Sequence, residues 1–141
     1  MLKSMIKVFG LVGLFLLVVG CGGVSTLEEY FDRNPDSLAE IREESDAEVA
    51  AMIAATGIDM SVEIEIDGPN TLVITFSYGP EVALADNVGE LLEAALEMEA
   101  STFRQQATEI REAAGVDTVY LVIRYLDGQG TLLAERTFAG Q

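Results

Sequence analysis

Apolar and polar residues alternate along two neighbouring stretches in the middle of the chain. Across residues 61–67 every second position is Val or Ile, and the positions between them carry Ser, Glu or Asp; residues 71–78 keep the same period. A period of two is typical of a strand with one face in the core. The residues between the two stretches, Asp-Gly-Pro-Asn, are turn formers. The pattern therefore predicts a hairpin of two strands, 61–67 and 71–78.

Two helices are predicted ahead of this hairpin. Thr26 and Glu29 have the spacing of a capping box, which starts a short helix. Ser37 with Glu40 gives a second start signal, and apolar residues then follow at near-helical spacing. We expect this second helix to end at Gly57 in a left-handed conformation.

A longer helical pattern follows the hairpin. Residues 86–114 carry an apolar stripe, with Asp86 placed to cap its start and Gly115 to end it. As one helix this stretch would be about 43 Å long at about 1.5 Å per residue, against about 27 Å for an eight-residue strand. We therefore expect either a bend near Ser101 and Thr102 or one end that projects beyond the sheet.

The last part of the chain has a second hairpin pattern. Residues 118–126 and 131–138 read as strands, and Asp-Gly-Gln-Gly lies between them. The predicted order is α-β-β-α-β-β. This order favours an α+β two-layer sandwich, in which a four-stranded, mainly antiparallel sheet has helices on one face. The pattern leaves the strand order open.

The start of the chain has the parts of a lipoprotein leader. Lys3 and Lys7 precede an apolar run at 8–19, and Val18-Val19-Gly20 lies directly before Cys21, the chain's one cysteine. The run is shorter than the about 20 apolar residues that a membrane-spanning helix needs. The pattern predicts cleavage before Cys21 and lipidation of its thiol.

This leader sets the expected domain organisation and location. Residues 1–20 would be a signal peptide, residues 21–26 a lipidated cysteine with a short tether, and residues 27–141 a single α+β domain. The protein would then be anchored by lipid at the extracytoplasmic face of the cell membrane.

Charge and composition exclude several classes of function. Without the leader, which holds both lysines, 24 acidic residues against six arginines give a formal charge of −18. Clustered cations supply the affinity for phosphates, so nucleic acid is not an expected partner. The chain has no histidine, and no lysine beyond the leader, so the commonest general base, zinc ligand and Schiff-base nucleophile are missing. We expect no enzymatic activity, no cofactor and no metal.

Carboxylates are the abundant reactive groups that remain. A paired acid and base could hydrolyse a glycosidic bond, and Glu63 and Glu65 share one face of a predicted strand. With 24 acidic residues such neighbours arise by chance, so a carboxylate-dependent hydrolase is a minor hypothesis. The sequence has no Asp-x-Asp-x-Asp-Gly calcium loop, and turn chemistry explains Asp127 and Gly128 better.

The third predicted strand has candidate partner-binding residues. Tyr120, Arg124 and Leu126 alternate with an apolar set on the same strand. If the apolar set meets the helices, these three lie on the open side of the sheet, beside Val73 and Leu133. A partly apolar surface that contains an arginine is a candidate binding face, although cross-strand packing alone explains it equally well.

Several short motifs occur in a familiar order after the leader. They are Leu27-Glu28-Glu29-Tyr30, Asn70-Thr71-Leu72, Ser101-Thr102-Phe103, Arg124-Tyr125-Leu126-Asp127 and Gly130-Thr131. With these motifs the chain resembles a family of small uncharacterised Gram-positive lipoproteins, a domain of unknown function that is mostly clostridial and actinobacterial. The resemblance implies a fold and a location at the membrane, and it brings no catalytic residues.

The leading hypothesis is a surface-anchored lipoprotein with a small non-enzymatic domain that binds a protein partner or an envelope component. The alternative is a ligand- or cation-binding accessory to a membrane transporter. A concave pocket between the sheet and its helices would favour the alternative.

Overall fold

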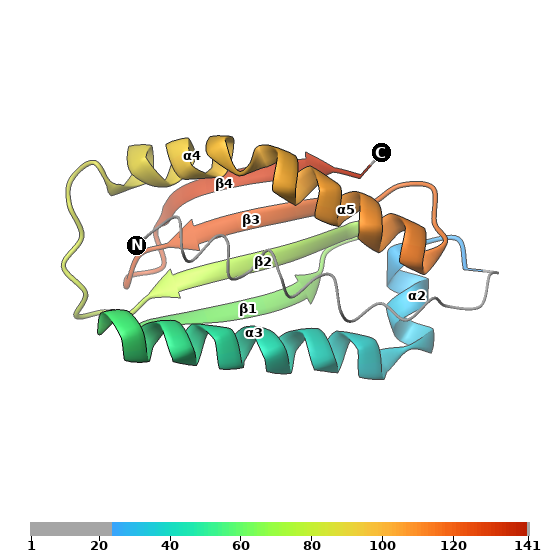
Figure 1. Ribbon diagram of the computed structural model, residues 1–141, viewed down its shortest axis with the longest axis horizontal. Helices are drawn as coiled ribbons and strands as arrows, with labels where there is room; N and C mark the ends of the chain where they lie inside the picture. Colours follow the sequence, from blue (N-terminus) through green and yellow to red (C-terminus); the bar gives the residue numbers. More distant parts are fainter. Residues whose placement is uncertain (1–23, 141) are drawn as a thin grey trace.

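The computed structural model describes residues 24–140, which form a sheet and a layer of helices (Figure 1). The helices within this range are α2 (Leu27–Arg33), α3 (Pro35–Thr56), α4 (Val88–Met98) and α5 (Ala100–Ala114); the strands are β1 (Met60–Ile66), β2 (Thr71–Tyr78), β3 (Tyr120–Leu126) and β4 (Leu132–Ala139). This order confirms the predicted α+β fold. None of these helices is long and apolar enough to cross a membrane.

The sheet consists of two hairpins that lie side by side. The strand order is β1-β2-β3-β4. Both hairpins are antiparallel, whereas the inner strands β2 and β3 run parallel, with Ile74 opposite Ile123. A parallel pair needs a long crossover connection, and here α4 and α5 supply it. The sheet is therefore mixed but mostly antiparallel, as expected.

One face of the sheet packs against the helices and forms the core. On β3, Leu121, Ile123 and Tyr125 are at most 1% exposed. The ring of Phe103 on α5 stacks on that of Phe138 on β4, with centroids 5.0 Å apart. In Figure 1, α3 lies along β1, while α4 and α5 lie along the β4 side. The helices thus also cover both outer edges of the sheet, which limits pairing with other strands.

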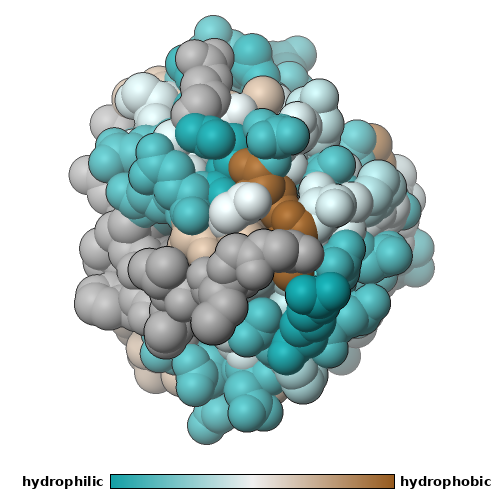
Figure 2. Space-filling model, turned by 90° about the vertical axis from the view of Figure 1, so that its right-hand side faces the viewer, coloured by the Kyte–Doolittle hydropathy of each residue, from teal (hydrophilic) through white to brown (hydrophobic). Residues whose placement is uncertain are grey.

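The first helix is tied to the turn between β1 and β2. The N–H of Leu27 donates to Asn70 Oδ1 at 3.2 Å, and the N–H of Glu28 donates to the Pro69 carbonyl at 2.9 Å. Thr26 Oγ1 accepts from the N–H of Glu29 at 3.1 Å, which confirms the predicted N-terminal cap. Seen from this end, the surface is mostly hydrophilic with a narrow hydrophobic strip near its centre (Figure 2).

The second helix begins earlier than predicted. Helix α3 starts at Pro35, with Asn34 as its N-cap, so the start signal at Ser37 lies inside the helix. Proline suits the first helical turn because its fixed φ is helical and its missing N–H would have no partner there. The predicted end is confirmed, since Gly57 adopts a left-handed φ of 74°.

The long helical stretch is divided into two helices. It breaks at Glu99, where φ is −100° and ψ is 11°, two residues before the predicted bend at Ser101. The break lets α4 and α5 follow the sheet, which a straight helix of about 43 Å would overrun. The prediction of Asp86 as cap was wrong: α4 begins at Val88 after Asn87, which makes no side-chain cap bond.

A buried tyrosine occupies the core beneath the helices. Tyr125 is 0% exposed and its ring stacks on Phe76 at 5.2 Å. Its hydroxyl has no hydrogen-bond partner among residues 24–140. Burial raises the pKa of Tyr125 above its ordinary value, and the nearby Tyr78 raises it further. Burial also raises the pKa of Tyr78.

Replacing Tyr125 with Phe should therefore stabilise the fold. An unsatisfied buried hydroxyl costs about 1–3 kcal/mol, so we expect a gain in the free energy of unfolding of about 1 kcal/mol at pH 8. Above pH 10, tyrosine ionises in the unfolded chain before it ionises in the core, so wild-type stability falls as pH rises. Between pH 8 and pH 11 the variant should lose less stability than the wild type. The loss that the variant still shows would come from Tyr78, whose pKa is also raised.

Urea unfolding at the two pH values, followed by circular dichroism, measures this difference. Tyr120→Phe, which removes an exposed hydroxyl, is the control. A Tyr125→Phe variant that is less stable than the wild type at pH 8 would show that the hydroxyl has a partner in the folded protein.

Candidate functional site

The three candidate residues of β3 lie on the sheet face opposite the helices. Successive side chains of a strand point to opposite faces, and Leu121 and Ile123 lie in the core beneath the helices. Tyr120, Arg124 and Leu126 therefore share the other face. We call this surface the β3 face, and define it by these three residues with Val73, Thr75, Val122, Leu132 and Glu135, which pair with them or lie between them.

The β3 face has a buried centre and an exposed periphery. Tyr120 is 42% exposed and Leu132 is 53% exposed, whereas Val73 is 1% exposed and Val122 is 8% exposed. Arg124 and Leu126 are intermediate. A partner at this face would therefore contact mainly Tyr120, Leu126 and Leu132, the large side chains around the centre.

Arg124 is held within the sheet by a neighbouring carboxylate. Its Nε lies 2.6 Å from Glu135 Oε2 on β4, directly opposite in the strand register. Their side chains are 33% and 37% exposed, and ion pairs of this kind contribute about 0–1 kcal/mol to stability. The pair places the guanidinium of Arg124 beside Glu135 on the β3 face.

The face differs from the prediction at one position. A register shift between Tyr125 and Leu126 pairs Leu126 with Leu132. Leu133 instead lines a hollow beside Gly89 on α4, so it does not belong to the β3 face. Sequence reasoning missed Leu132 because strict alternation from Glu135 places Leu133, not Leu132, on this side.

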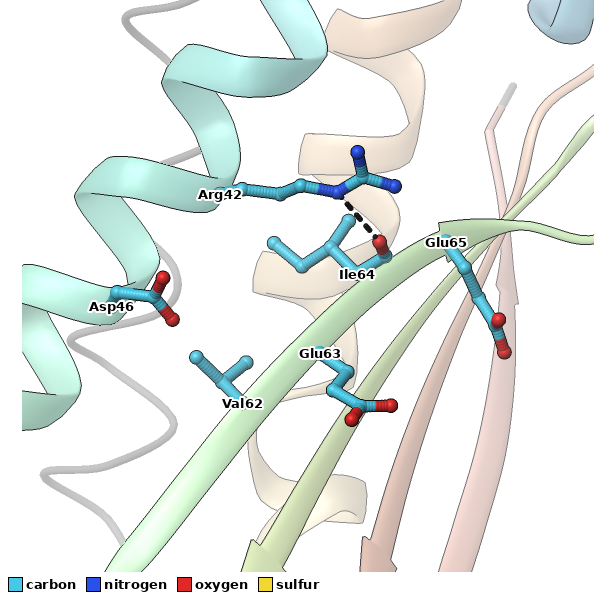
Figure 3. Close-up of a pocket in the computed structure, with 6 residues that line it drawn as sticks. All are labelled: Arg42, Asp46, Val62, Glu63, Ile64 and Glu65. Atoms are coloured by element: carbon cyan, nitrogen blue, oxygen red, sulfur yellow. Dashed lines mark hydrogen bonds between the residues drawn. The ribbon is translucent and has the colours of Figure 1, made fainter.

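A second feature is a hollow of about 300 Å³ between α3 and β1 (Figure 3). Its lining residues are Arg42, Asp46, Val62, Glu63, Ile64 and Glu65. Arg42 Nε donates to the Ile64 carbonyl at 3.0 Å. Figure 3 shows the guanidinium of Arg42 next to that carbonyl, and it shows Glu63 and Glu65 directed away from Arg42. The hollow thus presents one guanidinium beside the backbone of β1.

Arg42 and Asp46 face this hollow without pairing. They are four residues apart on α3, a spacing that allows an ion pair, yet no ion pair between them occurs in the described structure, whose ion pairs involve other arginines. Sequence analysis did not single out Arg42. The feature of the sequence that could have identified Arg42 is that it is the one basic residue of α3.

The carboxylates considered for a calcium site or for hydrolysis lie in a turn and on β1. Asp127 Oδ1 accepts from the N–H groups of Gln129 and Thr131, both at 2.8 Å, which confirms turn chemistry at this position. Glu63 and Glu65 are exposed on β1. Within residues 24–140 there is no group of three His, Cys, Asp or Glu side chains that could hold a metal ion.

Comparison with known families gives one match. Residues 25–138 match the family model described as Domain of unknown function (DUF4854). The chain belongs to this family. The DUF4854 domain extends from the N-cap region of α2 to the end of β4, so it coincides with the folded unit. Cys21 and the predicted leader precede the DUF4854 domain and lie outside the described residues. No curated protein and no solved structure matches the chain.

Proposed function

We propose that this DUF4854 protein is a bacterial surface lipoprotein whose small non-enzymatic domain binds a protein partner or an envelope component. Lipid on Cys21 would hold it at the extracytoplasmic face of the cell membrane. The leader pattern of residues 1–21 supports the anchor. The motifs quoted above support its placement among small Gram-positive lipoproteins, mostly clostridial and actinobacterial.

The observation that carries the proposed binding role is the β3 face. Exposed large apolar side chains on a folded domain mark interaction surfaces when they gather on one face. Tyr120 and Leu132 are two of the exposed large apolar residues, and both belong to this face. Tyrosine and arginine are enriched among the residues that dominate binding energy. Tyr120 and Arg124 are therefore the first residues to test.

The position of Tyr120 supports a partner close to the membrane. The N–H of Tyr120 donates to the Asn70 carbonyl at 2.8 Å, and Asn70 Oδ1 accepts from Leu27 at the start of α2. Tyr120 thus lies at the end of the sheet where the chain enters the domain. A tether of five residues, 22–26, extends at most about 17 Å, so the lipid would keep this end near the bilayer.

Replacing Tyr120 with Ala should weaken partner capture several-fold. The experiment is crosslinking in intact cells that express a C-terminally tagged protein, followed by detergent extraction and mass spectrometry. Ala50→Ser is the matched control, because Ala50 is exposed on α3, away from the β3 face. Equal recovery of the same partner with Tyr120→Ala would remove the β3 face from the proposal, and recovery of the bait alone would contradict partner binding.

A second candidate is a ligand-binding accessory to a membrane transporter, and the hollow at Arg42 favours it. A guanidinium and a carboxylate that do not pair with each other can bind a ligand carrying both charges. A thermal-shift screen of zwitterionic and anionic small molecules tests this role. Ligands that stabilise the wild type but not Arg42→Ala would support it, and a screen without such ligands would exclude it.

A further inference from the structure

Helix α4 has an exposed apolar stripe in addition to its buried one. Leu92, Ala95 and Leu96 face the core. Leu91 and Met98 are 47% and 60% exposed, and the exposed Ala94 lies between them on the same helix. Positions i, i+3 and i+7 lie on one side of a helix, so these three residues form a continuous stripe. We call it the α4 stripe; no helix or strand of residues 24–140 covers it.

Carboxylates lie beside the α4 stripe. Glu90, Glu93 and Glu97 occupy neighbouring positions on the same turns of α4. Glu97 pairs with Arg136 of β4. Glu90 and Glu93 form no ion pair with any residue from 24 to 140. An acidic residue in the first turn stabilises a helix through its dipole, which accounts for Glu90 but not for Glu93 one turn further on.

The same carboxylates line a hollow of about 630 Å³ between the start of α4 and β4. Its lining residues are Asp86, Gly89, Glu90, Glu93 and Leu133. Gly89 allows α4 and β4 to lie close together, because a Cβ at this position would lie 2.9 Å from the Leu133 carbonyl oxygen. The hollow combines an apolar side chain with three carboxylates. A long basic side chain has the matching chemistry, with an apolar stem and a cationic head.

We propose that the α4 stripe is a docking surface for an amphipathic helix of a partner protein, whose apolar side chains are flanked by lysine or arginine. Apolar anchors at i, i+3 or i+4, and i+7 would cover Leu91 and Met98. The flanking cations would reach Glu90 and Glu93, with one of them in the hollow beside Leu133. A second copy of this chain does not fit, because two such helices would bring their carboxylates together. This surface is separate from the β3 face.

Binding of a synthetic helical peptide tests this proposal. The probe has leucine on one stripe and lysine on both flanks, and the reference peptide has glutamate in place of each lysine. The full chain is held in nanodiscs of neutral lipid, with empty nanodiscs as the reference, and binding is followed by biolayer interferometry. We expect the lysine peptide to bind, and the paired change Leu91→Ser with Met98→Ser to weaken it roughly tenfold or more.

Matched variants separate this docking from general attraction to an acidic protein. Glu90→Gln with Glu93→Gln should weaken the lysine peptide, whereas Glu43→Gln with Glu44→Gln, exposed on α3, changes the net charge equally and should not. Equal weakening by the two charge pairs, unchanged binding in the serine variant, or no binding to the wild type would overturn the proposal. Tyr120→Ala should leave binding of the lysine peptide unchanged. A negative result for the α4 stripe can therefore be distinguished from a negative result for the β3 face.

Discussion

A Cys21→Ala variant should carry no lipid and should keep its first 20 residues. Lipid transfer needs the thiol as nucleophile, and cleavage of a lipoprotein leader follows that transfer. Cells fed an alkyne-labelled fatty acid should label the wild-type protein and leave the variant unlabelled. The variant should also migrate more slowly in a denaturing gel, because its leader remains attached.

Ser25→Ala is the control for this experiment, since Ser25 lies in the predicted tether and outside the cleavage motif. It should be labelled like the wild type. If the wild-type protein takes up no label, the chain is not a lipoprotein, and the proposed location fails. The fold, the β3 face and the α4 stripe would not be affected by that result.

Replacing Phe103 with Ala should lower the free energy of unfolding by about 3–5 kcal/mol. Phe103 is 1% exposed and stacks on Phe138, so it joins α5 to β4 across the core. Its loss removes apolar burial and leaves a cavity that neighbouring side chains fill only in part. The loss is a large share of the about 5–15 kcal/mol that stabilises a typical domain. Urea unfolding of the protein expressed without its first 21 residues measures the change.

The neighbouring residue supplies a matched control. Arg104 is exposed on the same helix, so Arg104→Ala should change the free energy of unfolding by less than about 0.5 kcal/mol. An equally small effect for Phe103→Ala would mean that α5 does not pack on the sheet as described.

The elements of the fold could be predicted because their signals are local. Alternation of valine or isoleucine with glutamate identified β1, and the left-handed residue Gly57 ended α3 where expected. The strand order could not be predicted in this way. Pairing of β2 with β3 depends on how α4 and α5 return the chain to the sheet, and this is a property of packing between distant residues. The break at Glu99 has the same origin, because the apolar stripe itself continues through it.

The candidate site was predictable in part. The period of two placed Tyr120, Arg124 and Leu126 on one face of a strand, and the structure has them on one face. Which neighbours join them depends on register, and the shift at Leu126 replaced Leu133 with Leu132. Arg42 was missed because its lack of an ion pair depends on the folded structure. Leu91 and Met98 of the α4 stripe were expected on the apolar stripe of residues 86–114 that faces the core, but they are 47% and 60% exposed. The sequence alone does not show which side chains are left without a neighbour in the folded protein.

The most direct test of partner binding is photocrosslinking from the β3 face in intact cells. A photoreactive phenylalanine replaces Tyr120, and in a control strain it replaces Ala47, which is exposed on α3. We expect a discrete adduct of higher mass from position 120 and none from position 47. No adduct from position 120, or the same adducts from both positions, would contradict partner binding at the β3 face.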